Sequence, residues 1–361
     1  MDLNRLKHLL DRAPSRRIVV IGDLMLDEFV WGKVGRISPE SPVPVVDVTG
    51  ESFYPGGAAN VARNLREFVD QVDVIGMIGA DRGGQQLRDL LAQQNIDISN
   101  AIESETFRTI VKTRIIARHQ QVVRVDREQI VVPSAEQTAR VIAAVRKKMP
   151  DIDAVIFEDY GKGFLTTELV SQIAREARAA GKIVAADPNP RHLIDWRVLN
   201  RAAVALALDA DPNPRHLIDW RGMTAIKPNR TEAFLAADIL WRDPNDSPAE
   251  DVDLMRAGEA LLEKLDTEYV LVTLGPHGMM LFQKNKPAHH IPTKVRQVFD
   301  VSGAGDTAIA LFTLGLVCEA TPIEAAEIAN HGSAVVVSKL GTATVTRDEL
   351  IASFREDSEN D

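Results

Sequence analysis

The chain has 361 residues, of which 45% are hydrophobic and 26% charged, a size and balance that allow one large α/β domain or two smaller ones. Its net charge of −10 argues against the basic surface that nucleic acids require, so we expect no nucleic-acid partner. The single cysteine, Cys318, excludes an intrachain disulfide and any metal site made of several thiolates.

The start of the chain lacks the pattern of a secretion signal. Residues 1–8 have the pattern of a polar-faced helix without an apolar core. No uncharged run reaches the length of a membrane span. These features predict a cytoplasmic protein with no membrane partner.

Apolar strands that end in glycine turns predict the fold class. Residues 17–23 form the first such strand, and further strand, turn and helix units follow at 72–91 and 154–179. Repetition of this unit is typical of a parallel sheet covered by helices. A ligand site is then expected at the carboxyl ends of the strands.

Two segments depart from this pattern and predict a small β lid. Residues 35–48 mix prolines with β-branched residues, as at an exposed sheet edge. Residues 109–126 alternate apolar and polar residues, as in an antiparallel pair with one solvated or ligand-facing side. The lid would comprise roughly 30–50 and 105–126. Its basic residues either hold a phosphate or only keep an exposed edge soluble: Lys112, Arg114, Arg118 and Arg124.

A perfect repeat interrupts the middle of the chain. The twelve residues at 186–197 recur letter for letter at 210–221, a shift of 24 residues (210 minus 186). A single repeat is not a solenoid, which needs three or more units, so we interpret it as a tandem duplication. We expect one copy in the structural slot and the other, with 198–209, looped out or in a peripheral helix.

Two glycine-rich helix starts are candidate ligand sites. Gly56 and Gly57 would let a ligand touch the backbone, with Asn60 hydrogen-bonding to hydroxyl groups. Residues 300–306 contain Gly303-Ala304-Gly305-Asp306 before an apolar helix, which predicts an anion cradle of backbone amides. Asp306 would take a proton from an attacking hydroxyl. The alternatives are a tight turn at the first start and a capped helix at the second.

Two carboxylates elsewhere also have two interpretations. Asp27, in the turn after the first strand, either binds sugar hydroxyls or satisfies the loop backbone. Asn229 and Glu232 have the spacing of a capping box, but this carboxylate could also hold Mg²⁺ through water beside a polyphosphate.

The two glycine motifs together resemble the signatures of the PfkB or ribokinase family of carbohydrate kinases. The first signature is carried by Gly56, Gly57, Asn60, Ala62, Gly76, Gly79, Asp81 and Gly84, and the second by 300–306. Further segments look like the heptose 7-phosphate kinases of lipopolysaccharide-core biosynthesis: 22–27, 36–45, 120–124, 159–163 and 339–342.

This resemblance implies a ribokinase-like three-layer α/β sandwich, with one kinase domain over 1–352 and an acidic tail over 353–361. It implies phosphorylation of D-glycero-β-D-manno-heptose 7-phosphate at C1 with ATP and Mg²⁺, with K⁺ as a further candidate cation. It also implies a homodimer through the lid. Such kinases are often fused to an adenylyltransferase, and this chain is too short to hold one, so it looks like a stand-alone kinase or an excised domain.

The resemblance also implies roles for single residues. Asp306 would be the base, and Gly303, Ala304 and Gly305 the anion hole. The sugar would be bound by Asp27, Gly56, Gly57 and Asn60. The nucleotide site would contain Asn229, Arg230, Thr231, Glu232, Gly275, Gly278 and Asn330, with Glu232 holding Mg²⁺ through water. Asp300 and Ser302 match a monovalent-cation loop. Our own hypothesis for the 7-phosphate is a set of lid or crevice cations, namely Arg114, Arg118, Arg124 and Lys162.

Three alternatives remain. The first is another sugar or nucleoside kinase of the same family. The second is an ATP-binding protein inactivated by the duplication, although the presence of Asp306 argues against it. The third is a nicotinamide-dependent oxidoreductase, which is weak because no Gly-x-Gly-x-x-Gly follows the first strand.

Overall fold

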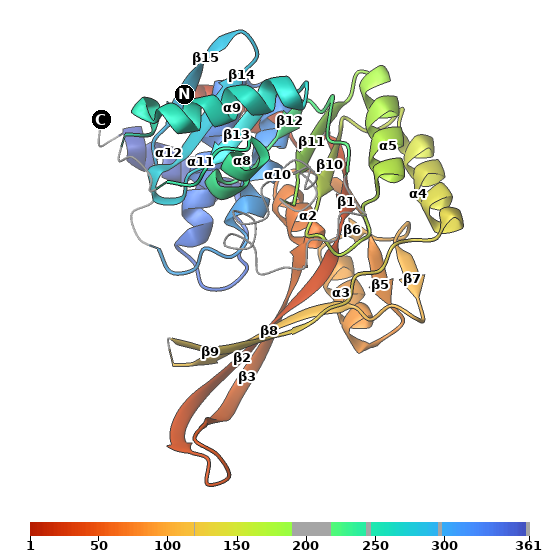
Figure 1. Ribbon diagram of the computed structural model, residues 1–361, viewed down its shortest axis with the longest axis vertical. Coiled ribbons are helices and arrows are strands. Elements are labelled where there is room, and N and C mark those ends of the chain that lie inside the picture. Colours follow the sequence, from red (N-terminus) through yellow and green to blue (C-terminus); the bar gives the residue numbers. More distant parts are fainter. Residues whose placement is uncertain (119, 190–217, 243–246, 295–297, 359–361) are drawn as a thin grey trace.

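The structure is a computed structural model that describes residues 1–118, 120–189, 218–242, 247–294 and 298–358. A central sheet forms the middle of the protein. Its described strands pair in parallel except for β14, which pairs antiparallel with both of its neighbours (Figure 1). In spatial order they are β15 (Lys286–Ile291), β14 (Met279–Gln283), β13 (Tyr269–Thr273), β12 (Ala225–Ile226), β11 (Ile183–Asp187), β10 (Ala154–Glu158), β1 (Arg17–Gly22), β4 (Gln71–Ile75) and β6 (Ile96–Asp97).

Helices cover both faces of this sheet. Along β1, Ile18 and Val20 enter one core while Val19 and Ile21 enter the other, which explains why the strand is apolar throughout. One core holds α1 (Leu3–Asp11), α2 (Ala58–Arg66), α3 (Arg82–Gln93), α10 (Ala304–Val317), α11 (Pro322–Val337) and α12 (Arg347–Ser358). The other holds α4 (Ala135–Lys148), α5 (Thr167–Ala179), α8 (Arg230–Ala236) and α9 (Val252–Lys264). The predicted three-layer α/β sandwich is confirmed.

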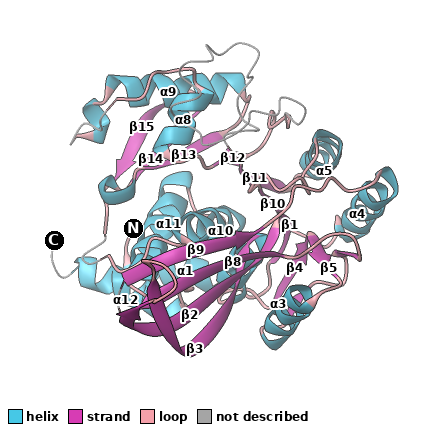
Figure 2. Ribbon diagram, turned by 60° about the horizontal axis from the view of Figure 1, so that its bottom comes forward, coloured by secondary structure: helices cyan, strands magenta, loops and turns pink. Residues whose placement is uncertain are grey.

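A second sheet projects from the body as the lid (Figures 1 and 2). Its strand order is β3 (Pro44–Gly57), β2 (Leu24–Ile37), β8 (Ile110–Ala117) and β9 (Gln120–Arg127), and these strands overlap the predicted lid segments. Only Asp23 separates β2 from β1, so a central strand of the body continues almost directly into the lid. Two short strands, β5 (Met77–Gly79) and β7 (Ile102–Ser104), pair separately, and η2 (Pro248–Glu250) and η3 (Gly275–His277) are single 3₁₀ turns. None of the described helices is long and apolar enough to cross a membrane.

The described ends of the duplicated stretch come from different copies. Asp187, in the first copy, closes β11 and forms an ion pair with Lys227. Trp220, in the second copy, is buried and packs edge-on against Phe157, with ring centroids 6.3 Å apart. Because the copies are identical, the start of the first and the end of the second make up one complete repeat. The expected looping-out of the other copy concerns 190–217, which lie outside the described residues.

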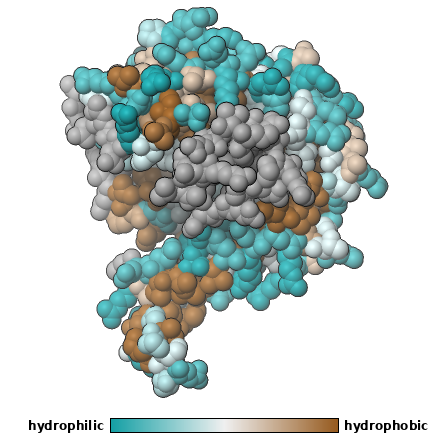
Figure 3. All heavy atoms as spheres, viewed as in Figure 1, coloured by the Kyte–Doolittle hydropathy of each residue, from teal (hydrophilic) through white to brown (hydrophobic). Residues whose placement is uncertain are grey.

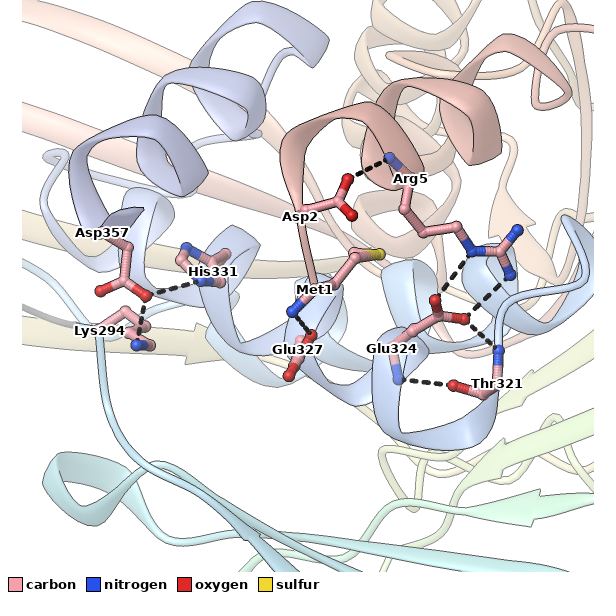
Figure 4. Close-up of polar contacts among 9 residues, drawn as sticks. All are labelled: Met1, Asp2, Arg5, Lys294, Thr321, Glu324, Glu327, His331 and Asp357. Atoms are coloured by element: carbon pink, nitrogen blue, oxygen red, sulfur yellow. Dashed lines mark hydrogen bonds and ion pairs between the residues drawn. The ribbon is translucent and has the colours of Figure 1, made fainter. Parts of the chain in front are cut away.

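The two ends of the chain are fastened to α11 (Figure 4). The Arg5 guanidinium donates to both carboxylate oxygens of Glu324 at 2.8 and 3.0 Å, and Glu324 also closes a capping box with Thr321. The Met1 ammonium bonds Glu327 at 2.8 Å. At the other end, Asp357 of α12 contacts Lys294 and approaches His331. These contacts fix the position of α11, which carries Asn330.

The Arg5–Glu324 pair predicts a pH-dependent contribution to stability. Glu324→Ala removes both the pair and half of the capping box, so we expect the free energy of unfolding to fall by about 1 kcal/mol. Glu324→Gln keeps the capping geometry but loses the charge, so we expect a loss of about 0.5 kcal/mol. Urea unfolding at neutral pH measures both.

The difference between wild type and Glu324→Gln should shrink in acid. The hydrogen bond from Arg5 lowers the pKa of Glu324 to about 2 from 4.5, so its stabilisation is complete above pH 4.5 and is lost as the pH falls toward 2. A difference that stays constant through this window would contradict the assignment.

Candidate active site

Asp306 lies in the first turn of α10, and two side chains from distant parts of the chain hold its carboxylate. The Asn60 amide donates to Oδ2 at 2.7 Å and the Tyr160 hydroxyl donates to Oδ1 at 2.8 Å. Asp306 is only 4% exposed, and burial raises its pKa to about 6, although the bonds from Asn60 and Tyr160 oppose the shift. A carboxylate with this pKa is largely ionised at neutral pH and is basic enough to take part in general base catalysis.

Open backbone amides lie directly beside this carboxylate. Gly303 precedes α10 with φ 80°, and a Cβ there would lie 2.7 Å from the Asn60 amide nitrogen, so only glycine fits. The amide of Ala304 bonds the carbonyl of Val301 at 3.3 Å. Among the described residues, the amides of Gly305 and Asp306 have no acceptor. The start of this long helix therefore offers donors and a positive dipole end to an anion, as the sequence predicted for 303–305.

A buried ion pair adds positive charge next to the amides. Lys227, the residue before Pro228, bonds Asp187 at the end of β11 with an Nζ–Oδ2 distance of 2.8 Å. A Cβ on Gly305 would lie 3.3 Å from this Nζ, so the ammonium borders the amide cradle. Burial alone would lower the pKa of Lys227, but Asp187 raises it, which keeps the lysine charged. Sequence analysis missed Lys227 and Asp187 as site residues, although Asp187 ends one buried strand and Lys227 directly follows another.

Glu158 closes β10 beside this pair. It is 1% exposed, and its Oε2 has no hydrogen-bond partner among the described residues. Burial, and after it the neighbouring Asp187, raises the pKa of Glu158 well above its ordinary value. This shift stabilises the protonated form relative to that of an exposed glutamate, which reduces the negative charge next to the amide cradle.

A cleft of about 470 Å³ leads away from the amide cradle. It includes three predicted nucleotide-site residues, Gly275, Gly278 and Asn330, and it reaches Ala304 and Gly305. The other lining residues are mostly small or apolar: Thr273, Pro276, Met279, Thr293, Val298, Val301, Ser333, Ala334 and Val337. Asn330 donates to the carbonyl of Pro292 at 2.7 Å, which fixes one wall. An apolar cleft that ends at open amides suits a nucleobase with a phosphate chain.

The predicted nucleotide-binding residues at the start of α8 differ in their contacts and in their exposure. Asn229 and Glu232 form a complete capping box, and Asn229 is bridged to Thr273 of the cleft wall. Arg230 instead is buried, pairs with Asp251 and stacks over Phe234 and Trp241. Arg230 is not among the described residues that line the cleft, so we leave it out of the proposed site. Thr231 is exposed.

Four of the predicted sugar-binding residues, Asp27, Gly56, Gly57 and Asn60, belong to one group of neighbouring segments that contacts Asp306 through Asn60. Asp27 is buried, accepts from the Thr342 hydroxyl at 3.2 Å and pairs with Arg114. A Cβ on Gly56 would lie 2.4 Å from the Asp27 carboxylate, and Gly57 has φ 58°. Asn60 joins this group to Asp306 through the bond already described.

Asp23 positions the loop that carries Tyr160. This buried carboxylate accepts the amides of Tyr160 and Lys162 at 2.9 and 3.0 Å and that of Phe164 at 3.3 Å. Sequence analysis did not predict the contact between Tyr160 and Asp306. The clue available was the position of 159–163 directly after a buried strand, where parallel-sheet ligand sites form.

The cations proposed for the 7-phosphate are largely committed elsewhere. Lys162 pairs with Glu128 at 2.7 Å, and Arg124 pairs with Asp126 on the same strand. Arg118 is exposed in the turn after β8, at the end of the lid strand that lies away from the body. Of the four proposed cations, Lys162 lies in the Tyr160 loop itself, and Arg114 pairs with Asp27 among the predicted sugar-binding residues.

Asp300 joins two loops by accepting the amide of Ser302 at 2.9 Å and that of Gly341 at 3.2 Å. The described residues contain no group of three or more metal-ligating side chains of the His, Cys, Asp and Glu kind. The assignment of a monovalent cation to Asp300 and Ser302 stays a prediction.

Comparison with known proteins agrees with this geometry. The pattern of the pfkB family carbohydrate kinases matches residues 15–349. The chain is 37% identical over 352 residues to the bifunctional protein HldE of Citrifermentans bemidjiense, and 37% identical over 351 residues to that of Pelobacter propionicus. These matches cover 98% and 97% of the chain but 66% of each relative, just under two thirds of its length.

Solved structures show the same fold. Phosphofructokinase-2 from Escherichia coli, in complex with substrates and products, matches with a TM-score of 0.71 at 19% identity, over 95% of this chain and 99% of that one. Arabidopsis thaliana ribokinase, complexed with ribose and ATP, matches with a TM-score of 0.65 at 16% identity, over 94% and 99%.

Fold and sequence together define an ATP-dependent carbohydrate kinase. Within that class, the chain belongs to the pfkB family.

Tyr160→Phe tests how the carboxylate is held. The hydroxyl of Tyr160 favours the ionised form of Asp306, so loss of this hydroxyl should raise the pKa of Asp306 by about one unit. In the pH profile of kcat/KM, the acidic limb should then shift to higher pH by the same amount. Activity above pH 8 should remain. Tyr269→Phe, on β13, is the control and should leave the limb in place. An unmoved limb in Tyr160→Phe would contradict the role of this bond.

Proposed function

We propose that the chain transfers the γ-phosphoryl group of ATP to the C1 hydroxyl of D-glycero-β-D-manno-heptose 7-phosphate, in the cytoplasm. The observation that carries the transfer is the position of Asp306, held by Asn60 and Tyr160 beside the open amides of Gly305 and Asp306. The choice of sugar rests on the motif resemblance and on the similarity to HldE proteins over nearly the whole chain.

In the proposed reaction Asp306 accepts the proton of the sugar hydroxyl. The hydroxyl oxygen forms a bond to the γ-phosphorus while the bond between this phosphorus and the bridging oxygen of ADP breaks. The amides of Gly305 and Asp306 and the ammonium of Lys227 stabilise the negative charge on the phosphoryl oxygens. The lid excludes water, which would otherwise compete as the acceptor.

The residues around the cleft fit Mg²⁺ as the metal that accompanies ATP. Glu232 is the half-buried carboxylate nearest the Lys227–Asp187 pair on α8, and it is the residue we assign to hold the ion through water. Bound Mg²⁺ would neutralise phosphate charge.

We also propose a homodimer that meets through the lids. Apolar side chains are exposed on this sheet, and Figure 3 shows them gathered on the projecting part of the molecule. On the strands they are Ile37, Val48, Val122, Val123 and Val125, and Val43 lies in the connection between β2 and β3. Exposed apolar patches of this kind are common at contacts between subunits.

A panel of sugars tests the substrate. With ATP and a coupled assay for ADP release, heptose 7-phosphate should give the highest kcat/KM among heptose 7-phosphate, ribose, fructose and fructose 6-phosphate. A clear preference for another sugar would replace the proposed substrate. Binding of ATP without transfer to any of them would favour the inactivated protein.

Deletion of residues 190–213 tests whether the duplication impairs the enzyme. The deletion leaves one complete repeat, and the flanking residues Asp187 and Trp220 keep their place in the sequence pattern. In the full chain Asp187 already pairs with Lys227, and Trp220 already packs against Phe157. We therefore expect kcat of the deletion variant to lie within about twofold of that of the full chain. A large gain of activity on deletion would show that the duplication is inhibitory.

A further inference from the structure

Lys112 faces the sugar side of the site from the lid. On β8 it is the register partner of Asp27 on β2, so the two side chains lie on the same face of the lid sheet. Its ammonium lies over the ring of Tyr160, 5.2 Å from the centroid. The hydroxyl of the same tyrosine bonds Asp306. One tyrosine side chain therefore separates the ammonium from the base.

Lys112 differs from its cationic neighbours in its pairing. Arg114, Lys162 and Lys227 each form an ion pair, with Asp27, Glu128 and Asp187 respectively. Within the part of the chain that the structure describes, Lys112 forms none. Burial lowers the pKa of Lys112, while the more distant Asp27 partly opposes the shift. A partly buried ammonium without a close anion is unfavourable unless a ligand supplies one.

We propose that Lys112 binds the phosphate group of the sugar phosphate and so makes the enzyme select phosphorylated sugars over neutral ones. This inference rests on the proposed function. The attacked hydroxyl must reach Asp306, and the phosphate lies at the other end of the sugar, so a cation one tyrosine away from the base is placed for it. The phosphate also supplies the anion that Lys112 lacks.

The same geometry favours Lys112 over Arg114 as the phosphate ligand. Its guanidinium is held by Asp27 and lies over Phe29, 5.2 Å from the ring centroid. Removing Arg114 would leave the buried Asp27 unpaired and disturb the sugar site as a whole. Lys112 can be changed without breaking an ion pair between described residues.

The test compares a phosphorylated with a neutral sugar. For Lys112→Met, KM for heptose 7-phosphate should rise at least tenfold, while KM for ATP and kcat/KM for the unphosphorylated heptose should stay within twofold. Lys112→Arg should restore part of the preference for the phosphorylated sugar. Lys33→Gln, an exposed lid cation on β2, is the matched control and should resemble wild type.

The outcomes separate this inference from the proposed function. If wild type does not use heptose 7-phosphate, the proposed function fails, and the same comparison is made with fructose 6-phosphate against fructose. If wild type uses a phosphorylated sugar and Lys112→Met keeps the same preference for it, the proposed role of Lys112 is wrong, while the proposed kinase activity stands.

If wild type prefers neutral sugars, the inference about Lys112 is also overturned. If no sugar is phosphorylated, calorimetric binding of heptose 7-phosphate must weaken in Lys112→Met, and equal binding overturns the inference.

Discussion

The site depends on keeping one buried carboxylate ionised beside a bare helix start. Asp306 is almost fully buried, which disfavours its charge, and the hydrogen bonds from Asn60 and Tyr160, followed by the charge of Lys227, counter this effect. These donors come from α2 and from the loop after β10, which the parallel sheet brings to the same edge as α10. Asp23 in turn holds the Tyr160 loop by its backbone amides. The catalytic geometry is thus a consequence of strand order, and it does not rest on any one motif.

Charge is arranged around this carboxylate so that an anion can approach. Burial raises the pKa of Glu158 and of Asp187, to about 6 for the latter, while Lys227 stays charged through its pair with Asp187. Two cations then border the space on either side of Asp306, with Lys227 next to the amide cradle and Lys112 across the Tyr160 ring. If Lys112 binds the sugar phosphate as proposed, the position of the lid and the binding of that sugar are coupled. An acidic protein could then bind the two anionic substrates that we propose, because its donors are local.

The sequence predicted the layers and the cradle because both have local signals. Strands such as β1 are apolar along their buried length because helices cover both faces, and Gly303 is needed where a Cβ would meet Asn60. The roles of Tyr160 and Lys227 could not be predicted in this way, because each depends on contacts between distant segments. The alternating pattern of 109–126 marked Lys112 as one of four candidate phosphate ligands, but choosing among the four needed the contacts of Tyr160 and Asp27. Arg230 shows the converse: its capping-box neighbours fix the backbone of α8, but Asp251 determines where the side chain points. The sequence could not tell which copy of the duplicated stretch takes the structural position. Among the described residues, Asp187 of the first copy and Trp220 of the second both make packing or ion-pair contacts with the body of the protein.

The central claim is that Asp306 removes the proton from the sugar hydroxyl. The most direct measurement is single-turnover phosphoryl transfer by Asp306→Asn, together with calorimetric binding of ATP and of the sugar phosphate. The account predicts that both ligands bind with affinities close to those of wild type and that transfer slows by about a thousandfold, the range of general base catalysis. Transfer at the wild-type rate by a folded Asp306→Asn protein would contradict it.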